Sequence, residues 1–199
     1  MITDDFFVDI HTHATLRAFN ATFSDGQRNI WEKVTNHAFE TPVGRWARMK
    51  SREVSKTSQA NLYNYAKGNT RIIFDSLYPM EKGFLNFRKL PSAMVGKENA
   101  DILLKTVTGI DDSQLVALRN NRDYFQELLG QYAFLYKGQG NSPDGNFRYQ
   151  LASNYDEAQQ IVSSDPNALA VIVTIEGAHA LNCGSVSYTH LTLPTICSV

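Results

Sequence analysis

Cysteine is scarce in this chain of 199 residues, and its scarcity sets the first limit on function. The two cysteines, Cys183 and Cys197, both lie near the C-terminus. A framework of several disulfides needs more cysteines than this, and so does a zinc site built from thiolates. Any metal site in this chain must therefore use nitrogen and oxygen ligands.

The sequence also lacks long apolar runs and an excess of either charge. No apolar run reaches the roughly 20 residues that a transmembrane helix needs, and Met1 to Asp5 are acidic where a signal peptide is basic. The 19 basic and 20 acidic residues give a net charge of -1, which creates no overall field toward nucleic acid or an anionic membrane. We therefore expect a cytoplasmic protein with no nucleic-acid or membrane partner.

Apolar residues make up 43% of the chain, enough for one globular domain with its own core. Three apolar runs, at 6–13, 71–78 and 169–176, predict strands, and a shorter strand is predicted over 147–152. Near-continuous apolar runs favour strands that are covered on both faces, as in parallel sheets. The first of them has Val8 and Ile10 on its apolar face.

Helices are predicted between these strands, over 58–67, 97–106, 113–137 and 155–163, whereas the rest of 14–69 predicts a long connection without a strand. Ser58 and Asn154 are the expected N-caps of the first and last of these helices. The helix over 113–137 has apolar residues three and four positions apart, which predict its core-facing side: Leu115, Leu118, Phe125, Leu128, Tyr132 and Tyr136. The alternation of strands and helices predicts an α/β fold with a parallel sheet.

Two histidines stand where the first predicted strand ends. Because side chains alternate between the two faces of a strand, Asp9, His11 and His13 are predicted to share one face. Imidazoles that a rigid strand holds in this way can bind the same cation. The alternative is that each histidine is only a hydrogen-bonded residue at the end of a strand.

A carboxylate stands at the end of the strand predicted over 169–176. Glu176 is costly to bury unless it is paired, hydrogen-bonded or bound to a metal. In a (β/α)8 barrel the active site lies at the carboxyl ends of the strands, so Glu176 is expected at the same mouth as His11 and His13. A salt bridge from Glu176 to a lysine or arginine is the alternative.

These two segments resemble motifs of a known superfamily of enzymes. Asp-Ile-His-Thr-His at 9–13 is similar to the first-strand metal signature of the amidohydrolase-like metal-dependent hydrolases. Ile-Glu-Gly-Ala-His at 175–179 is similar to the Glu-Gly-Gly-His segment of the membrane (renal) dipeptidase family in that superfamily. The resemblance extends from Asp5 to Leu181. It departs from the dipeptidases at the first strand, where they have His-x-Asp and this chain has His-x-His, as other branches do.

The resemblance implies an activity and a set of ligands. His11 and His13 would bind the first of two divalent metal ions, Glu176 would bridge both ions, and Asp9 would orient a ligand without binding metal. His179 would contact the substrate pocket, with a hydrogen-bonded structural histidine as the alternative. Zinc suits histidine and glutamate ligands best, although manganese, cobalt and iron accept them too. The implied reaction is hydrolysis of a small-molecule substrate, a dipeptide or related small amide, by a metal-bridging hydroxide.

The end of the chain differs in character. Val-Ser-Tyr-Thr-His-Leu-Thr-Leu-Pro-Thr, at 186–195, resembles the in-frame translation of a transposase adaptor used in making sequencing libraries. We therefore expect 1–185 to be the N-terminal part of a (β/α)8 TIM barrel, truncated after about its third strand, and 186–199 to be a non-native tail. The later histidine ligands and the aspartate of the family have no counterpart before Ser185. The chain by itself is expected to bind metal weakly and to lack turnover.

Two other functions are compatible with the same residues. Asp-x-His-x-His at 9–13 also opens the phosphoesterases of the polymerase-and-histidinol-phosphatase type, although Glu-Gly-Ala-His at 176–179 stands where they have Thr-Asp-His. The third possibility is an α/β module without enzymatic activity, in which the histidines and the glutamate are structural.

Overall fold

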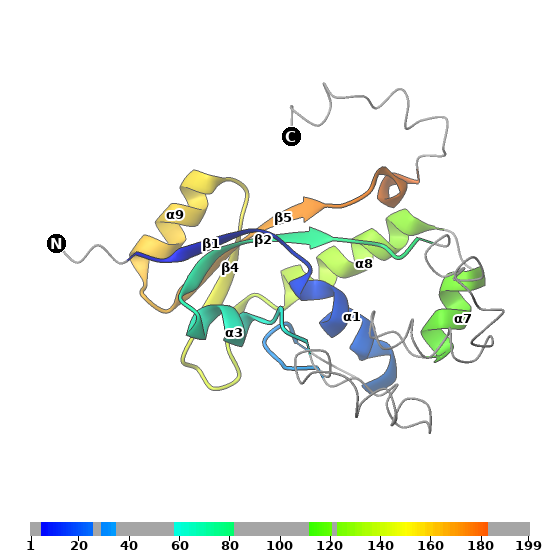
Figure 1. Cartoon of the computed structure of the whole chain (residues 1–199), viewed down its shortest axis with the longest axis horizontal. Helices are drawn as coiled ribbons and strands as arrows, with labels where there is room; N and C mark the ends of the chain where they lie inside the picture. The colour runs from blue at the N-terminus through cyan, green and yellow to red at the C-terminus, as the bar shows by residue number, and fades with distance from the viewer. Residues whose placement is uncertain (1–4, 26–28, 35–57, 82–111, 121–122, 183–199) are drawn as a thin grey trace, which may run out of the picture.

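The computed structural model describes residues 5–25, 29–34, 58–81, 112–120 and 123–182, which form a mixed α/β fold (Figure 1). The strands form one sheet of five in the order β1 (Phe7–Thr12), β2 (Thr70–Leu77), β5 (Ala168–Ile175), β4 (Arg148–Ala152) and β3 (Gly140–Asn141). β1, β2, β5 and β4 run parallel to one another, and β3 is antiparallel to β4. The predicted α/β class with a parallel sheet is therefore confirmed.

Helices cover both faces of this sheet. Those on one side in Figure 1 are α1 (Ala14–Asp25), α3 (Leu62–Lys67) and α8 (Tyr124–Lys137), while α9 (Tyr155–Ser164) lies on the other. α7 (Asp112–Asn120) lies beside the end of α1, and a short 3₁₀ turn, η4 (Ala178–Leu181), follows β5. None of the helices in the described part of the chain combines the length and the apolar character needed to cross a membrane.

Alternation along the central strands divides the core into two parts. Ile73 of β2 and Val171 of β5 are register partners, and they pack in one cluster with Leu135 of α8. Ile72 and Ala170, one position earlier, point to the opposite face and pack against α9. All five side chains are completely buried, so β2 and β5 are covered on both faces, as their near-continuous apolar sequences predicted.

The predicted strands and the capped helix near the C-terminus are confirmed within one or two residues. The runs at 71–78, 147–152 and 169–176 form β2, β4 and β5, and the helix over 155–163 is α9. Asn154 caps α9 as expected, because its side-chain oxygen accepts a hydrogen bond from the backbone N–H of Glu157.

The first strand is present, but it is not buried as the sequence predicted. Phe7 and Ile10 are 69% and 77% exposed. The reason is that β1 is the edge strand of the sheet and, among the described strands, pairs only with β2. An apolar run indicates a strand, but it does not indicate whether a neighbour lies on both of its sides.

The prediction for 14–69 missed a helix and placed the start of another too early. α1 packs through Ala14 and Ala18, whose spacing of one helical turn places two small side chains against the core. α3 begins at Leu62, after an N-cap at Asn61, and not after Ser58. Asn61 accepts from Asn64 N–H, whereas the Ser58 hydroxyl accepts from a residue distant in the chain.

The single helix predicted over 113–137 is two helices, α7 and α8. Asp123 interrupts it, because its backbone leaves the helical region at ψ 81° and its side chain caps α8 by accepting from Gln126 N–H. The restart changes which residues of α8 face the core: these are Leu128, Gln131 and Leu135.

The predicted core stripe is therefore correct only in part. Leu115 and Leu128 are buried, and Leu118 packs partly buried against the core. Phe125, Tyr132 and Tyr136 were predicted to be core and are 40% to 57% exposed. The helix predicted over 97–106 and the tail at 186–199 lie outside the described residues.

Candidate metal centre

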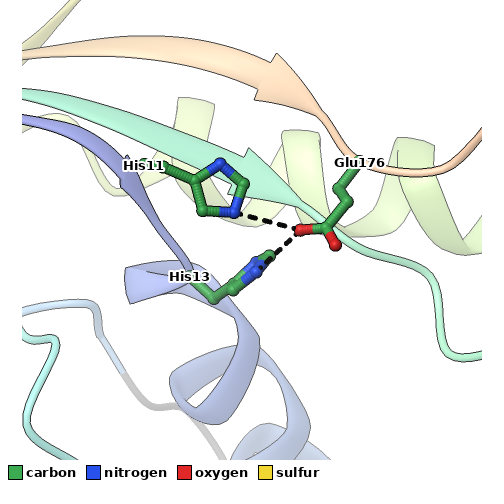
Figure 2. A group of neighbouring side chains, drawn as sticks. All are labelled: His11, His13 and Glu176. Carbon is green, nitrogen blue, oxygen red and sulfur yellow. Dashed lines mark ion pairs between the residues drawn. The ribbon is translucent and has the colours of Figure 1, made fainter.

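His11, His13 and Glu176 meet at the carboxyl ends of β1 and β5 (Figure 2). His11 lies near the end of β1, His13 follows β1, and Glu176 directly follows β5. Glu176 Oε2 lies 3.2 Å from His11 Nε2 and 2.9 Å from His13 Nε2. The two imidazole rings stand nearly perpendicular, with their centroids 5.1 Å apart. Residues from opposite ends of the sequence thus direct three potential ligand atoms at one point.

The spacing of these atoms suits a shared cation. Each residue offers one ligand atom, and the three atoms all lie within 4.8 Å of one another. Two ligand atoms on a tetrahedral zinc ion, each about 2.0–2.2 Å from it, are roughly 3.3–3.6 Å apart. The two nitrogen–oxygen distances are slightly shorter, so small outward movements of the side chains would make room for an ion. Within the described ranges, this is the one group of three or more histidine, cysteine or carboxylate side chains close enough to bind a metal.

Glu176 Oε2 has an unusual environment. The atom is buried, although the side chain as a whole is 43% exposed, and it forms no hydrogen bond of acceptable geometry. Buried polar atoms are nearly always hydrogen-bonded. The close contacts to His11 and His13 are therefore approaches of three potential ligand atoms, which a cation would complete, and not a satisfied hydrogen-bond network.

In the described part of the chain, no lysine or arginine takes the alternative role of partner to Glu176. Among the described residues, Glu176 forms ion-pair contacts with the two imidazoles alone. The carboxylate of Glu176 therefore faces groups that can bind a metal when neutral.

The orientation of His13 also favours metal binding. Its Nδ1 lies 2.7 Å from the backbone oxygen of Ser76. Because a carbonyl can only accept a hydrogen bond, Nδ1 carries the hydrogen, and Nε2 of the neutral ring presents its lone pair to Glu176. Metal-binding histidines are commonly oriented by a carbonyl in this way.

The end of β2 holds the site together without supplying a ligand. The backbone N–H of Glu176 donates to the Leu77 carbonyl at 3.0 Å, beside the Ser76 carbonyl that orients His13. The Thr174 hydroxyl donates to the Ser76 hydroxyl at 3.1 Å. β2 lies between β1 and β5, so its end is in contact with both ligand-bearing strands.

Strict alternation predicted that Asp9 shares a face with the two histidines, and this prediction is wrong. Asp9 pairs with Ile73 and Thr12 pairs with Asp75, and the register shifts between these pairs. Ile73 and Asp75 point to the same face of β2, so the shift places Asp9 and Thr12 together on that face. The irregularity in β1, which no sequence pattern marks, is the physical reason for the error.

The contacts of Asp9 connect it to α3 and to the main chain of His11. One carboxylate oxygen accepts from the Tyr65 hydroxyl at 3.0 Å, and the other accepts from the backbone N–H of His11 at 3.1 Å. The Tyr65 hydroxyl also lies 2.6 Å from the Thr12 hydroxyl. Burial is the main reason that the pKa of Tyr65 rises to about 12, and the nearby Asp9 charge adds to it. Asp9 therefore acts on His11 through the backbone.

His179, the remaining residue singled out from the sequence, lies beside the cluster and is only 5% exposed. Its Nε2 is 2.8 Å from the Pro79 carbonyl oxygen, and its Nδ1 is 2.9 Å from Glu81 Oε1. The ring stands edge-on to Tyr78 and Tyr124. Both ring nitrogens thus face protein oxygen atoms.

Asp75 is a buried carboxyl group that the sequence interpretation did not single out. It is completely buried on β2 and accepts hydrogen bonds from the Thr15 hydroxyl at 2.5 Å and the Thr15 N–H at 3.4 Å. Burial raises the pKa of Asp75, and the Thr15 hydrogen bonds oppose this shift. The available signal was an acidic residue inside the apolar run at 71–78.

No protein-family model, curated protein or solved structure matches this chain. The interpretation of the site therefore depends on its own geometry and on the motifs at 9–13 and 175–179.

Proposed function

We propose that His11, His13 and Glu176 bind a divalent metal ion, zinc in the first instance, and that the chain is part of a metal-dependent hydrolase. One observation carries this proposal: a buried carboxylate oxygen without a hydrogen bond lies about 3 Å from two imidazole nitrogens. The Ser76 carbonyl supports it further, because it leaves Nε2 of His13 free to act as a ligand.

Each residue of the site has its own role in such a hydrolase. His11 and His13 supply neutral nitrogen ligands, and Glu176 supplies the negative charge that offsets a divalent ion. A bound divalent metal lowers the pKa of its water ligand and polarises a carbonyl or phosphoryl oxygen. In the binuclear form that the motifs imply, Glu176 would hold both ions, and further ligands would have to come from outside this group of three.

We further propose a barrel and a substrate class. β1, β2 and β5 lie side by side, with candidate ligands at the carboxyl ends of β1 and β5, as in part of a (β/α)8 barrel, whereas β4 precedes β5 in the chain and pairs with its other side. The helices on both faces are a feature that a complete barrel would not share, because a barrel carries its helices outside. Glu-Gly-Ala-His at 176–179 favours dipeptides or related small amides as substrates over phosphate esters.

A zinc titration tests the metal site directly. The chain, stripped of metal by a chelator, is titrated with zinc in competition with a chromophoric chelator. We expect one zinc per chain, bound weakly because the three residues form only part of the implied site, and a further loss of affinity on the order of 100-fold in His13→Ala, because a ligand is removed. His190→Ala is the matched control, a histidine substitution in the segment 186–195 that resembles adaptor sequence. Equal affinity in His13→Ala and the wild type would contradict the metal site.

Hydrolysis assays test the function. The zinc-loaded chain is compared with a protein in which the source gene's own sequence continues after Ser185 in place of the adaptor-like tail. Both are assayed on a panel of dipeptides and on a phosphate monoester. We expect only the second protein to cleave dipeptides. Phosphate-ester cleavage would instead identify the phosphoesterase alternative, and the absence of metal binding would identify a non-enzymatic module.

A further inference from the structure

The turn that follows Glu176 has a shape that only glycine permits. Gly177 has φ +84°, a region that L side chains rarely adopt. A Cβ atom at this position would also overlap the imidazole ring of His179, which folds back over the glycine. The chain direction after Glu176 and the position of His179 are therefore set together.

His179 connects this turn to the segment that follows β2. Its Nε2 contacts the carbonyl of Pro79, and its Nδ1 contacts the carboxylate of Glu81. The rings of Tyr78 and Tyr124 lie against it, with centroids 5.4 and 5.2 Å away. A ring so enclosed has little freedom to rotate.

The segment that His179 contacts is itself held in place by α8. The completely buried side chain of Gln131 accepts from the N–H of Tyr78 at 3.0 Å and donates to the carbonyl of Tyr78 at 3.1 Å. Glu127 accepts from the N–H of Met80 at 3.2 Å. Residues 78–81 thus form a firm support for the ring of His179.

Three carbonyl groups, at the end of β2 and just beyond it, contact the candidate ligands or the turn that follows Glu176. The Ser76 carbonyl contacts His13 Nδ1, and the Leu77 carbonyl accepts from the backbone N–H of Glu176. The Pro79 carbonyl contacts His179 Nε2, three residues beyond Glu176. Two of these carbonyls act on the ligands directly, and the third acts on the turn that leads away from Glu176.

We propose that His179 is a positioning residue, which fixes the carboxylate of Glu176 by fastening its turn to the Pro79 carbonyl. This role rests on the proposed metal site. His179 contributes no ligand atom to the group of three. Its effect is to hold Glu176 Oε2 where both imidazoles reach it, so the metal does not have to order the turn when it binds.

The turn keeps other attachments when His179 is replaced, so a variant should remain folded. Asn182, at the end of η4, donates to the Asp123 carboxylate at 2.8 Å and accepts from the N–H of Phe125 at 3.3 Å. Ala180 is completely buried in the main core cluster.

Two substitutions of His179 separate positioning from simple packing. Glutamine places its amide nitrogen near the position of Nε2 and can still donate to Pro79, whereas the shorter asparagine cannot reach it. We expect His179→Gln to bind zinc within about threefold of the wild type and His179→Asn to lose roughly 10- to 100-fold, the usual cost of removing a group that orients a ligand. The visible spectrum of bound Co²⁺ should change in His179→Asn alone.

Val162→Ala is the matched control, because it removes buried methyl groups from α9 on the other side of the sheet. It should lower the unfolding midpoint and leave zinc affinity and the Co²⁺ spectrum unchanged. Wild-type affinity in His179→Asn would overturn the positioning role and leave the metal site intact. If the wild type binds no zinc, the proposed function fails, and the role of His179 fails with it.

Discussion

The two ends of the same sheet treat a charged side chain in opposite ways. At the amino end of β2, Arg71 is 8% exposed, and its guanidinium donates to the carbonyls of Val162, Asp165 and Ala168. At the carboxyl end, beyond β5, the buried oxygen of Glu176 has no hydrogen bond.

The difference distinguishes a charge with a structural role from the carboxylate of the proposed metal site. Backbone carbonyls surround the cation of Arg71, and the ring of Phe6 lies 5.8 Å away, so the network at this end is complete without a ligand. The group at Glu176 is incomplete, because Oε2 forms no hydrogen bond although Nε2 of His11 and Nε2 of His13 lie 3.2 and 2.9 Å away. We propose that this incomplete polar cluster is where a ligand binds.

The largest expected effect on stability is at the amino end of β2, where the hydrogen bonds of Arg71 are complete. Arg71→Met removes the donor from three carbonyls that have little access to water, and we expect the free energy of unfolding to fall by about 3–5 kcal/mol. Zinc affinity of the folded variant should stay at the wild-type value, because the site lies at the other end of the strands. Urea unfolding and zinc titration at a temperature where the variant is folded test both statements. A stability equal to that of the wild type would contradict the structural role of Arg71.

Glu176→Gln should have the opposite effect to Arg71→Met: it should lower zinc affinity and leave stability nearly unchanged. Glutamine keeps the shape and removes the charge, so we expect zinc affinity to fall on the order of 100-fold, or about 2.7 kcal/mol. Stability without metal should change by less than about 0.5 kcal/mol, because no hydrogen bond to Oε2 is lost. Chelator-treated samples at pH 8 are the relevant ones for unfolding. A clear loss of stability with unchanged affinity would identify a structural ion pair.

Gly177→Ala should affect stability and binding together. We expect a loss of roughly 1–3 kcal/mol from the backbone conformation, because φ is +84°, and a fall in zinc affinity of about tenfold as the ring of His179 is displaced. Gly145→Ala is a control with φ +72° and open space around its Cβ position. Gly145→Ala should lower stability alone. Equal zinc affinity in both variants would show that the turn does not position Glu176.

The smallest expected effect is on the pH dependence of stability, through Glu127, a largely buried acid that contacts the segment after β2. Burial raises the pKa of Glu127 to about 7 from its ordinary 4.5, so the folded chain binds more protons than the unfolded chain between these values. The free energy of unfolding should therefore fall as pH rises from about 4.5 to 7, by roughly 1–2 kcal/mol after allowance for partial exposure. Glu127→Gln keeps an acceptor for Met80 N–H and should flatten this slope. Urea unfolding across that pH range measures it, and an unchanged slope would assign the pH dependence to another group.

Local sequence patterns predicted the elements whose surroundings are uniform. The runs that became β2 and β5 are apolar on both faces and are buried on both faces, and Asn154 starts α9 through a contact within its own turn. Patterns failed where a neighbour decided the outcome. Ile10 is as apolar as its counterparts in β2, yet it is exposed, because β1 lies at the edge of the sheet.

The sequence by itself singled out His11, His13 and Glu176 as candidate ligands, because the residue types, their positions at strand ends and the motifs around them are local properties. Tertiary structure alone decided that these side chains meet, since sheet order and register depend on contacts between segments far apart in the chain. It also decided that Asp9 faces away, through one register shift, and that the carbonyls of β2 orient the site. Every residue carries a carbonyl group, so no side-chain pattern can mark the ones that matter.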